Sequence, residues 1–508
     1  MFCKINSCGL LGINAFHVDT EIEISKGVVD FTIIGLGDAA VKESKDRVRV
    51  AMRSSGLRFP DAKVTVNLAP ADIKKAGTLL DLSIIAALLT ATGEINADLS
   101  DSVFIGEASL GGEIKAVSGV LPMTILSKRE GYKNIFVPCD NAFEASVVDG
   151  INVYGVKTVR DLINHFKRIN VIPPQKKYIP DETILRNIND FADVKGQSVV
   201  KKAIEFAAAG GHNLLMLGPP GSGKSMLAKR IPTILPPLTF DESIDITGIY
   251  SVAAMVDKKN PLITRRPFRS PHTNSSLPAL TGGGSIPKPG ELSLAHHGVL
   301  FLDELPEFNR STLEALRQPL EDREITVSRT GGTFTYPCRV MLVAAMNPCP
   351  CGFFGSSKKQ CSCTDAKKKQ YISKISGPLL DRFDIQIEVG ETDYESLASA
   401  RKEESSEVIR ERVSKAREIQ SARYKNTGIS CNADITDDII NEVCVMTPEA
   451  SEHFKTAFDS LGLSGRAFAR ILKVARTIAD TENEKLIGKK HINKAVNFRT
   501  LDRKYWSN

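Results

Sequence analysis

A glycine-rich motif, GPPGSGKS, constrains this chain more than any other part of its sequence. It follows a short apolar run, Asn213 to Leu217, and precedes a stretch of helical character that begins at Met226. In this strand–loop–helix context the pattern G-x-x-x-x-G-K-[ST] binds nucleotide phosphates, because its backbone N–H groups and the following helix N-terminus attract anionic oxygens. The sequence therefore predicts a site for ATP with Mg²⁺, formed by Gly218, Pro219, Pro220, Gly221, Ser222, Gly223, Lys224 and Ser225.

Four polar side chains have predicted roles in this site. Lys224 is expected to reach the β- and γ-phosphates, and the Ser225 hydroxyl is expected to bind Mg²⁺. A second apolar run, Gly298 to Leu302, ends in two adjacent carboxylates. Asp303 is expected to hold the Mg²⁺, and Glu304 is expected to orient and deprotonate the attacking water. The sequence thus predicts nucleotide hydrolysis as well as nucleotide binding.

A third apolar run, Val340 to Ala345, is followed by Asn347, whose amide is expected to bind the same water or the γ-phosphate. GPPGSGKS, FLDE, this polar residue and GPLLDRFD (Gly377 to Asp384) together resemble the AAA+ ATPases. By that resemblance Arg382 is the arginine finger, which projects into the nucleotide site of a neighbouring subunit. Arg466, within GLSGRAFARILKVARTIAD, is by the same resemblance the sensor-2 residue that touches the γ-phosphate.

The composition is that of an ordinary globular protein, with 42% hydrophobic and 25% charged residues. No uncharged apolar run of about 18 residues is present, and the first stretch, MFCKINSCGLLGINAF, has no cleavage site of a secretion signal. We therefore expect a cytoplasmic protein without a membrane partner. The net charge of +6 over 508 residues is too small to indicate nucleic-acid binding by itself.

Hydrophobic periodicity divides the chain into three domains. Strand-like and helical runs alternate in the first domain, and VIPPQKKYIP (Val171 to Pro180), with its three prolines, begins a linker. Strands and helices alternate again around the phosphate loop, and helical runs such as Arg401 to Arg423 dominate the last part. The predicted units are residues 1–170, a linker at 171–188, residues 189–392 and residues 393–508.

Three further segments resemble the YifB/ComM proteins, a magnesium-chelatase-like branch of the AAA+ ATPases. They are RRPFRSPHTNSSLPALTGGGSIPKPGELSLAHHGVLFLDELPEF (Arg265 to Phe308), NPCPCG and GLGDAAVKESKDRVRVA. This resemblance covers nearly the whole chain and implies an α/β AAA+ core with a parallel sheet and a C-terminal helical lid. It also implies a homo-hexameric motor that acts as a helicase on single-stranded or branched DNA, in DNA uptake or recombination. The alternative is a chelatase-type regulatory ATPase that remodels a partner protein.

The first domain resembles the S5-like α+β fold of Lon-type peptidases. In those enzymes a nucleophilic serine follows a glycine by two positions, and here Leu79 occupies that position after Gly77. Without its nucleophile a serine–lysine dyad cannot form an acyl-enzyme. We therefore expect a degenerate domain without peptidase activity, although Thr78 and Ser83 remain alternative nucleophiles.

Two pairs of cysteines form a candidate metal site in the core. Four thiolates suit tetrahedral zinc, but the C-x-C spacing is tighter than the usual C-x₂₋₄-C of structural sites. Zinc bound near Asn347 and a surface loop with ordinary thiols are both open interpretations. The four residues are Cys349, Cys351, Cys361 and Cys363.

A predicted β-hairpin carries the candidate DNA contacts. The segment EITVSRTGGTFTYP (Glu324 to Pro337) alternates in polarity around Thr330-Gly331-Gly332. It lies where related AAA+ helicases carry a hairpin that lines the central pore, so Arg329 is the first candidate phosphate contact. Further positive charges surround the cysteine loop, and a solvated lysine-rich loop without a DNA contact is the alternative interpretation. The lysine candidates are Lys367, Lys368 and Lys369.

Overall fold

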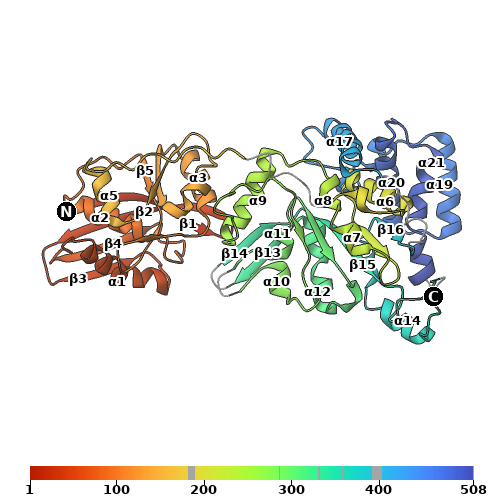
Figure 1. The fold of residues 1–508 in the computed structure, drawn as a ribbon, viewed down its shortest axis with the longest axis horizontal. Coiled ribbons are helices and arrows are strands. Elements are labelled where there is room, and N and C mark those ends of the chain that lie inside the picture. Colours follow the sequence, from red (N-terminus) through yellow and green to blue (C-terminus); the bar gives the residue numbers. More distant parts are fainter. Residues whose placement is uncertain (181–188, 285–286, 330–331, 357–358, 392–402, 507–508) are drawn as a thin grey trace.

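The computed structural model describes residues 1–180, 189–284, 287–329, 332–356, 359–391 and 403–506. Figure 1 shows an elongated molecule, with the first domain at one end, the phosphate-loop core in the middle and the last helices at the opposite end. Within the described residues, no helix is long and apolar enough to cross a membrane.

The first domain is built on a mixed seven-stranded sheet in the order β3-β4-β2-β1-β5-β8-β9. Two long antiparallel strands at its centre, β1 and β2, were not predicted from the sequence. Their register pairs Phe2 with Glu23 and Leu11 with Asn14 around a tight turn at Gly12. The strands are β1 Phe2–Leu11, β2 Asn14–Ser25, β3 Asp30–Ile34, β4 Lys63–Ala69, β5 Ser102–Phe104, β8 Asn134–Pro138 and β9 Asn152–Val156, with a small separate pair, β6 Glu107–Ala108 and β7 Ile114–Lys115.

Helices cover this sheet, and one of them is almost entirely buried. Helix α2 (Asp81–Ala91) has the sequence DLSIIAALLTA, which is apolar on all sides and packs against β1, β2 and α1. A helix that is hydrophobic all round belongs inside a core. The other helical segments are α1 Ala39–Ser54, α3 Val120–Arg129, η1 Cys139–Asn141, α4 Ala142–Ala145 and α5 Val159–Phe166.

The core contains a five-stranded parallel sheet in the order β11-β12-β15-β10-β16. Every residue of β10, β12 and β15 is buried, as expected for parallel strands with helices on both faces. The strands are β10 Leu214–Leu217, β11 Phe268–Arg269, β12 Val299–Leu302, β15 Met341–Met346 and β16 Ile385–Glu388. This is the α/β parallel-sheet core that the sequence predicted, and it is consistent with an AAA+ fold.

Short helices and one hairpin surround the core sheet. The hairpin pairs β13 (Glu324–Arg329) with β14 (Gly332–Pro337), as predicted, and its turn at 330–331 lies outside the described residues. The helical segments are η3 Phe191–Asp193, α6 Ser198–Gly210, α7 Lys224–Ala228, α8 Ile231–Ile234, α9 Phe240–Val252, α10 Leu277–Thr281, α11 Glu291–Leu294, η4 Leu305–Glu307, α12 Arg310–Ala315, α13 Arg317–Asp322, α14 Asp365–Ile372 and α15 Gly377–Leu380.

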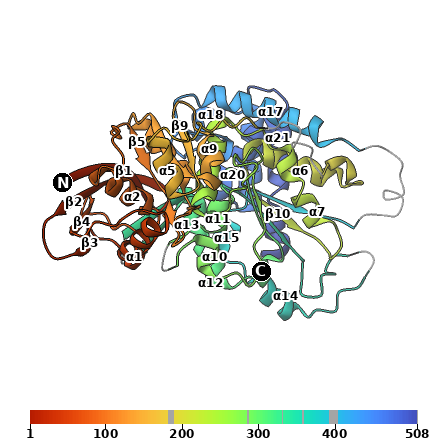
Figure 2. The same cartoon turned by 60° about the vertical axis from the view of Figure 1, so that its left-hand side comes forward.

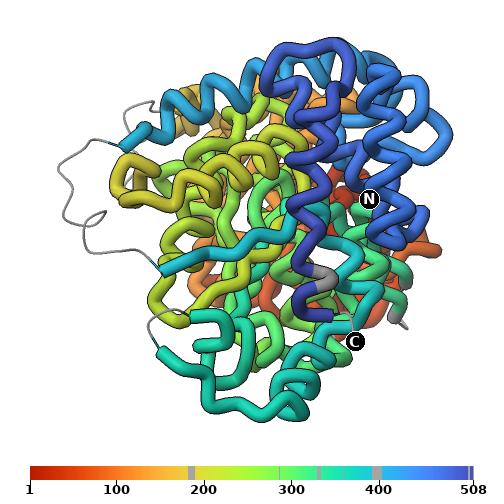
Figure 3. The backbone as a smooth tube through the Cα atoms, turned by 90° about the vertical axis from the view of Figure 1, so that its right-hand side faces the viewer, coloured from red at the N-terminus to blue at the C-terminus, as the bar shows by residue number. Residues whose placement is uncertain are grey.

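The C-terminal region is helical and packs on one side of the core (Figure 3). Helix α17 lies against α6, as Figure 2 also shows. It begins at Ser406, five residues later than predicted, because the Ser405 hydroxyl accepts the Val408 N–H as an N-cap; part of the predicted start, 401–402, lies outside the described residues. The segments are α17 Ser406–Arg423, η5 Asn432–Asp434, α18 Ile440–Val443, α19 Pro448–Leu461, α20 Gly465–Thr481, α21 Lys489–Asn497 and a final turn, Asp502–Trp506.

Buried contacts join the first domain to the core through α3, α4 and α9. The Glu144 carboxylate accepts the Leu121 N–H at 3.0 Å and the Ser251 hydroxyl of α9, and the Gly119 N–H donates to the Ser251 carbonyl at 3.1 Å. Part of the predicted linker is fixed here, because Tyr178 is buried in an apolar cluster with Leu121, Val147, Val148 and Leu262. The remaining linker residues, 181–188, lie outside the described residues.

A second contact joins the β1–β2 turn to the β13–β14 hairpin. Ile13 of the turn packs into the same apolar cluster as Phe334 and Tyr336 of β14. Gly12 has φ 64°, and a Cβ at this position would lie 3.4 Å from the Phe334 ring. The turn therefore lies directly against the hairpin that the sequence assigned to DNA.

The buried ion pair between Arg47 and Asp81 gives a stability prediction for the first domain. Asp81 is fully buried and accepts Nε of Arg47 at 2.9 Å, and burial raises the pKa of its carboxyl. We expect Arg47→Met to destabilise this domain by about 3–5 kcal/mol, because it leaves a buried carboxylate without its partner. Hydrogen exchange in peptides from α1 and α2 measures the loss, which should shrink at low pH as Asp81 becomes neutral.

The matched control is Lys133→Met, which removes an exposed ion pair with Asp101 at 2.6 Å. Exposed pairs contribute little to stability, so this variant should exchange like the unmodified protein. Equal protection in both variants would contradict the assigned importance of the buried pair.

Candidate nucleotide site

The phosphate loop lies between the end of β10 and the start of α7, as the sequence predicted. Gly221 and Gly223 have φ of 77° and 89°, a region of backbone conformation that glycine adopts without strain. Gly218 is confined for a different reason, because a Cβ there would collide with the carbonyl oxygen of Val389 beside β16. The loop is therefore fixed by its own backbone and by the neighbouring strand.

Lys224 is held inside the loop. Its Nζ donates to the carbonyl oxygens of Gly218 at 2.7 Å and Pro219 at 2.8 Å, and lies 3.3 Å from Oδ1 of Asn347. Burial lowers the pKa of Lys224 to about 8, and the nearby Asp303 and Glu304 carboxylates oppose this shift. The ammonium is thus partly desolvated, and additional negative charge beside it would raise its pKa.

Ser225 and Asp303 come from different segments but meet at the same edge of the sheet. The Ser225 hydroxyl donates to Oδ2 of Asp303 at 2.6 Å. Hydroxyl and carboxylate oxygens are ligands that Mg²⁺ accepts, usually together with water and substrate phosphates. The donor set at this edge therefore fits a magnesium ion.

Glu304 and Asn347 flank this pair. Glu304 is exposed and has φ 51°, an uncommon backbone conformation for a residue with a side chain, and its N–H donates to Oδ1 of Asp303 at 3.0 Å. Asn347 follows β15 and contacts Lys224 through its amide oxygen. The structure thus brings Lys224, Ser225, Asp303 and Asn347 together.

Arg382 and Arg466 lie at the opposite edge of the sheet. Arg382 precedes β16 and pairs with Glu321, while Arg466 lies in the first turn of α20, 68% exposed and 3.8 Å from Asp381. Both line one cavity with Asn213, the residue just before β10. Neither arginine reaches the phosphate loop of its own chain, which begins at the other end of β10.

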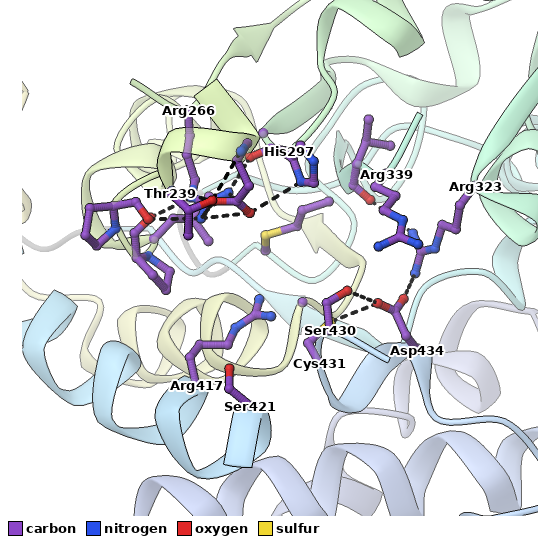
Figure 4. Close-up of a pocket in the computed structure, with 18 of the residues that line it drawn as sticks. Thr239, Arg266, His297, Arg323, Arg339, Arg417, Ser421, Ser430, Cys431 and Asp434 are labelled. Carbon is purple, nitrogen blue, oxygen red and sulfur yellow. Dashed lines mark hydrogen bonds and ion pairs between the residues drawn. The ribbon is translucent and has the colours of Figure 1, made fainter. Parts of the chain in front are cut away.

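A second cavity, of about 540 Å³, lies at this same edge, where the parallel strands of the core begin (Figure 4). It was not predicted from the sequence. In the figure, guanidinium groups approach it from the core and from α17. Arg266 pairs with Glu242 at 3.1 Å and Arg323 with Asp434 at 2.6 Å. Its basic lining residues include Arg266, Arg323, Arg339 and Arg417, which are scattered along the sequence and form no local motif.

The four core cysteines meet in one cluster. Sγ of Cys349 lies 3.4 Å from that of Cys351 and 3.7 Å from that of Cys361, and Cys363 completes a set within 4.8 Å. Zinc–sulfur bonds of about 2.3 Å in a tetrahedron place sulfurs about 3.8 Å apart, so the cluster fits zinc. A hydrogen bond from the Phe353 N–H lowers the pKa of Cys351 to about 6, whereas burial raises the pKa of Cys349 to about 12.

The candidate DNA residues lie on two separate elements. Arg329 is the last residue of β13, opposite Gly332, and its side chain lies outside the described residues. The three lysines, expected around the cysteine loop, lie on helix α14, which begins after Thr364, whose hydroxyl accepts the Lys367 N–H. Lys367 and Lys369 are exposed, whereas Lys368 pairs with Asp365 at 3.1 Å.

The alternative peptidase nucleophiles of the first domain are engaged in structural contacts. Ser83 is fully buried, donates to the Leu80 carbonyl at 2.8 Å and lies 2.9 Å from the Thr20 hydroxyl. Thr78 donates to the Glu107 carboxylate. In this structure a substrate cannot reach the Ser83 hydroxyl.

Three family models match consecutive parts of the chain. Residues 190–397 match "Magnesium chelatase, subunit ChlI", residues 20–141 match "Subunit ChlI of Mg-chelatase" and residues 403–499 match the C-terminal part of that subunit. Two shorter similarities each cover about a third of the chain at 26% identity. Lon protease 2 of Bacillus subtilis matches over 192 residues, which are 34% of that protein. The DNA replication licensing factor mcm7 of Schizosaccharomyces pombe matches over 170 residues, which are 20% of that protein. The similarity to a Lon protease is therefore weak.

Two relatives match over nearly their full length. The competence protein ComM of Haemophilus influenzae is 40% identical over 502 residues, which cover 97% of this chain and 96% of ComM. The uncharacterised protein YifB of Escherichia coli is 40% identical over 504 residues, covering 98% of this chain and 97% of YifB. With the phosphate loop, the parallel sheet and these matches, the chain belongs to the YifB/ComM family of magnesium-chelatase-like AAA+ ATPases.

Proposed function

We propose that this protein is a motor driven by Mg²⁺ and ATP that assembles as a homo-hexameric ring and moves on single-stranded or branched DNA. Family membership already implies an ATPase. The ring is inferred from one observation, the separation of the candidate site into two groups of residues at opposite edges of the sheet. The phosphate loop, Asp303 and Asn347 lie at the carboxyl edge of the sheet, whereas Arg382 and Arg466 lie at the amino edge.

The chain's own residues account for binding and hydrolysis in this proposal. Lys224 and the loop N–H groups hold the phosphates, while Ser225 and Asp303 hold Mg²⁺, which neutralises charge on the phosphate oxygens. Glu304 accepts a proton from the attacking water, and Asn347 orients that water or the γ-phosphate. The neighbouring subunit contributes Arg382 and Arg466, which stabilise negative charge as the phosphoryl group leaves.

The DNA role rests on the hairpin, the lysines and the relatives. The β13–β14 hairpin comes just before β15 in the chain, and Lys367 and Lys369 are exposed on α14. One full-length relative is a competence protein, and the partial match to a DNA replication licensing factor points in the same direction. A chelatase-type regulatory ATPase that remodels a partner protein is the second candidate, favoured by the match to the magnesium chelatase subunit.

ATP is the substrate of the reaction and Mg²⁺ is its cofactor, and zinc is the second metal ion of the proposal. The sulfur–sulfur distances of the cysteine cluster fit tetrahedral zinc with no open position, so its role is structural.

ATP binding should take up protons near pH 8.5. The pKa of Lys224 is about 8 in the free protein, and the phosphates would raise it, so a largely neutral amine becomes charged on binding. Affinity should therefore fall as the pH rises above 8. Titration calorimetry in two buffers of different ionisation enthalpy measures the uptake, which should disappear in Lys224→Arg because arginine stays charged. The same uptake in that variant would exclude Lys224 as its source.

Arg382 should act across a subunit interface. Arg382→Ala should lower ATP turnover roughly 10³-fold or more, the scale of an arginine finger. Mixing this variant with Lys224→Ala should restore part of the activity, because some interfaces then combine an intact phosphate loop with an intact arginine. Mixing it with an Arg382→Ala/Lys224→Ala double variant should restore none. Without rescue in the first mixture, the arginine would not act in trans.

DNA should raise ATP turnover and bind largely without regard to base sequence. Each phosphate neutralised on a single strand contributes about −0.7 to the slope of log affinity against log salt. Arg329→Ala should make this slope shallower, and the exposed Arg53 of α1, in the first domain, provides the control Arg53→Ala. Turnover that ignores every DNA form at low salt but responds to a protein partner would favour the chelatase-type alternative.

A further inference from the structure

The cysteine cluster lies directly against the phosphate loop. Cys349 is only two residues beyond Asn347, whose amide oxygen contacts Lys224. After Cys351 the chain turns at Gly352, which has φ 84°, and a Cβ at Gly352 would lie 2.5 Å from Cδ of Pro220 in the phosphate loop. The backbone of the cysteine loop and the phosphate loop are therefore in close contact at one point.

Two further contacts tie the cysteine loop to the same edge of the sheet. Tyr371, on the helix that follows Cys363, is buried, and its hydroxyl lies beside the backbone of Asn347. The Ser356 hydroxyl donates to Glu391, just beyond β16, at 2.7 Å. In the described residues between the two cysteine pairs there are bends and one short turn but no helix or strand, so regular secondary structure does not hold this loop in place.

We propose that zinc bound by the four cysteines holds this loop against Pro220 and Asn347, so that metal occupancy sets the affinity of the phosphate loop for ATP. The inference rests on the zinc and nucleotide sites proposed above. Loss of the metal frees two segments of the loop from each other, and the Gly352 contact then no longer restrains the phosphate loop. Asn347 also loses its fixed position beside Lys224.

Substitutions at two glycines of the loop distinguish the effect of the loop contact on ATP affinity from the effect of metal binding. Gly352 and Gly355 have nearly the same φ, 84° and 81°, so alanine strains the backbone similarly at either position. A Cβ at Gly352 would collide with Pro220, whereas a Cβ at Gly355 has no atom within 4 Å. Gly352→Ala therefore pushes the loop away from the phosphate loop with all four thiols intact, and Gly355→Ala is its matched control.

The experiment measures zinc by elemental analysis and ATP affinity by fluorescence of a labelled ATP, on the full-length protein with Mg²⁺ in excess. The unmodified protein should contain about one zinc per chain. Cys361→Ser/Cys363→Ser should lose the zinc and bind ATP about tenfold more weakly, the size of one lost hydrogen bond to a charged group. Gly352→Ala should keep its zinc and bind ATP similarly weakly, while Gly355→Ala should keep both properties.

Each outcome tests a different step. If the cysteine variant fails to fold, removal of zinc from the unmodified protein by a chelator, followed by its return as Zn²⁺, should lower and restore ATP affinity. Unchanged affinity in zinc-free protein, or in Gly352→Ala, would overturn the coupling. If the unmodified protein contains no zinc as purified and still binds ATP normally, both the metal site and the inference are wrong. If the unmodified protein contains zinc but does not bind ATP, the nucleotide site is wrong instead.

Discussion

The parallel direction of the core strands determines where each part of the candidate site lies. Because β10, β12 and β15 run the same way, the segments that leave them share one edge, which places the phosphate loop, Asp303 and Asn347 together. The segment that enters β16 lies at the opposite edge, and Arg382 lies there. Four residues of β10 span about 13 Å at roughly 3.3 Å per residue, and this length of strand separates the two groups within one chain.

Local patterns were predicted well because their physical causes are local. GPPGSGKS requires its own glycines and helix start, and the alternation of Glu324 to Pro337 is enough to specify a hairpin. The β1–β2 pair was missed, because an apolar N-terminal stretch with a central glycine was read only as a failed secretion signal. Its partners make it a strand, since β1 lies between β2 and β5 in the middle of a sheet.

Contacts between segments that are distant in the sequence could not be predicted from local patterns. Nothing local to Arg466 indicates that it lies beside Asp381, and the four arginines around the second cavity come from separate elements. The cysteine spacing left zinc open, because a C-x-C pair alone does not reveal whether the second pair returns to it. In the structure Cys361 lies within 3.7 Å of both Cys349 and Cys351, and this proximity is the tertiary information that spacing lacks.

The contact between the β1–β2 turn and the β13–β14 hairpin has a mechanical consequence. Ile13 packs against the same apolar cluster as Phe334, and Gly12 lies close to the Phe334 ring, so movement of the hairpin toward the first domain would press on that domain's longest strands. Those strands form the centre of a seven-stranded sheet, which makes them a stiff support. A force on the hairpin in this direction would therefore be resisted by the sheet of the first domain. The β1–β2 turn offers no such resistance to movement in the opposite direction.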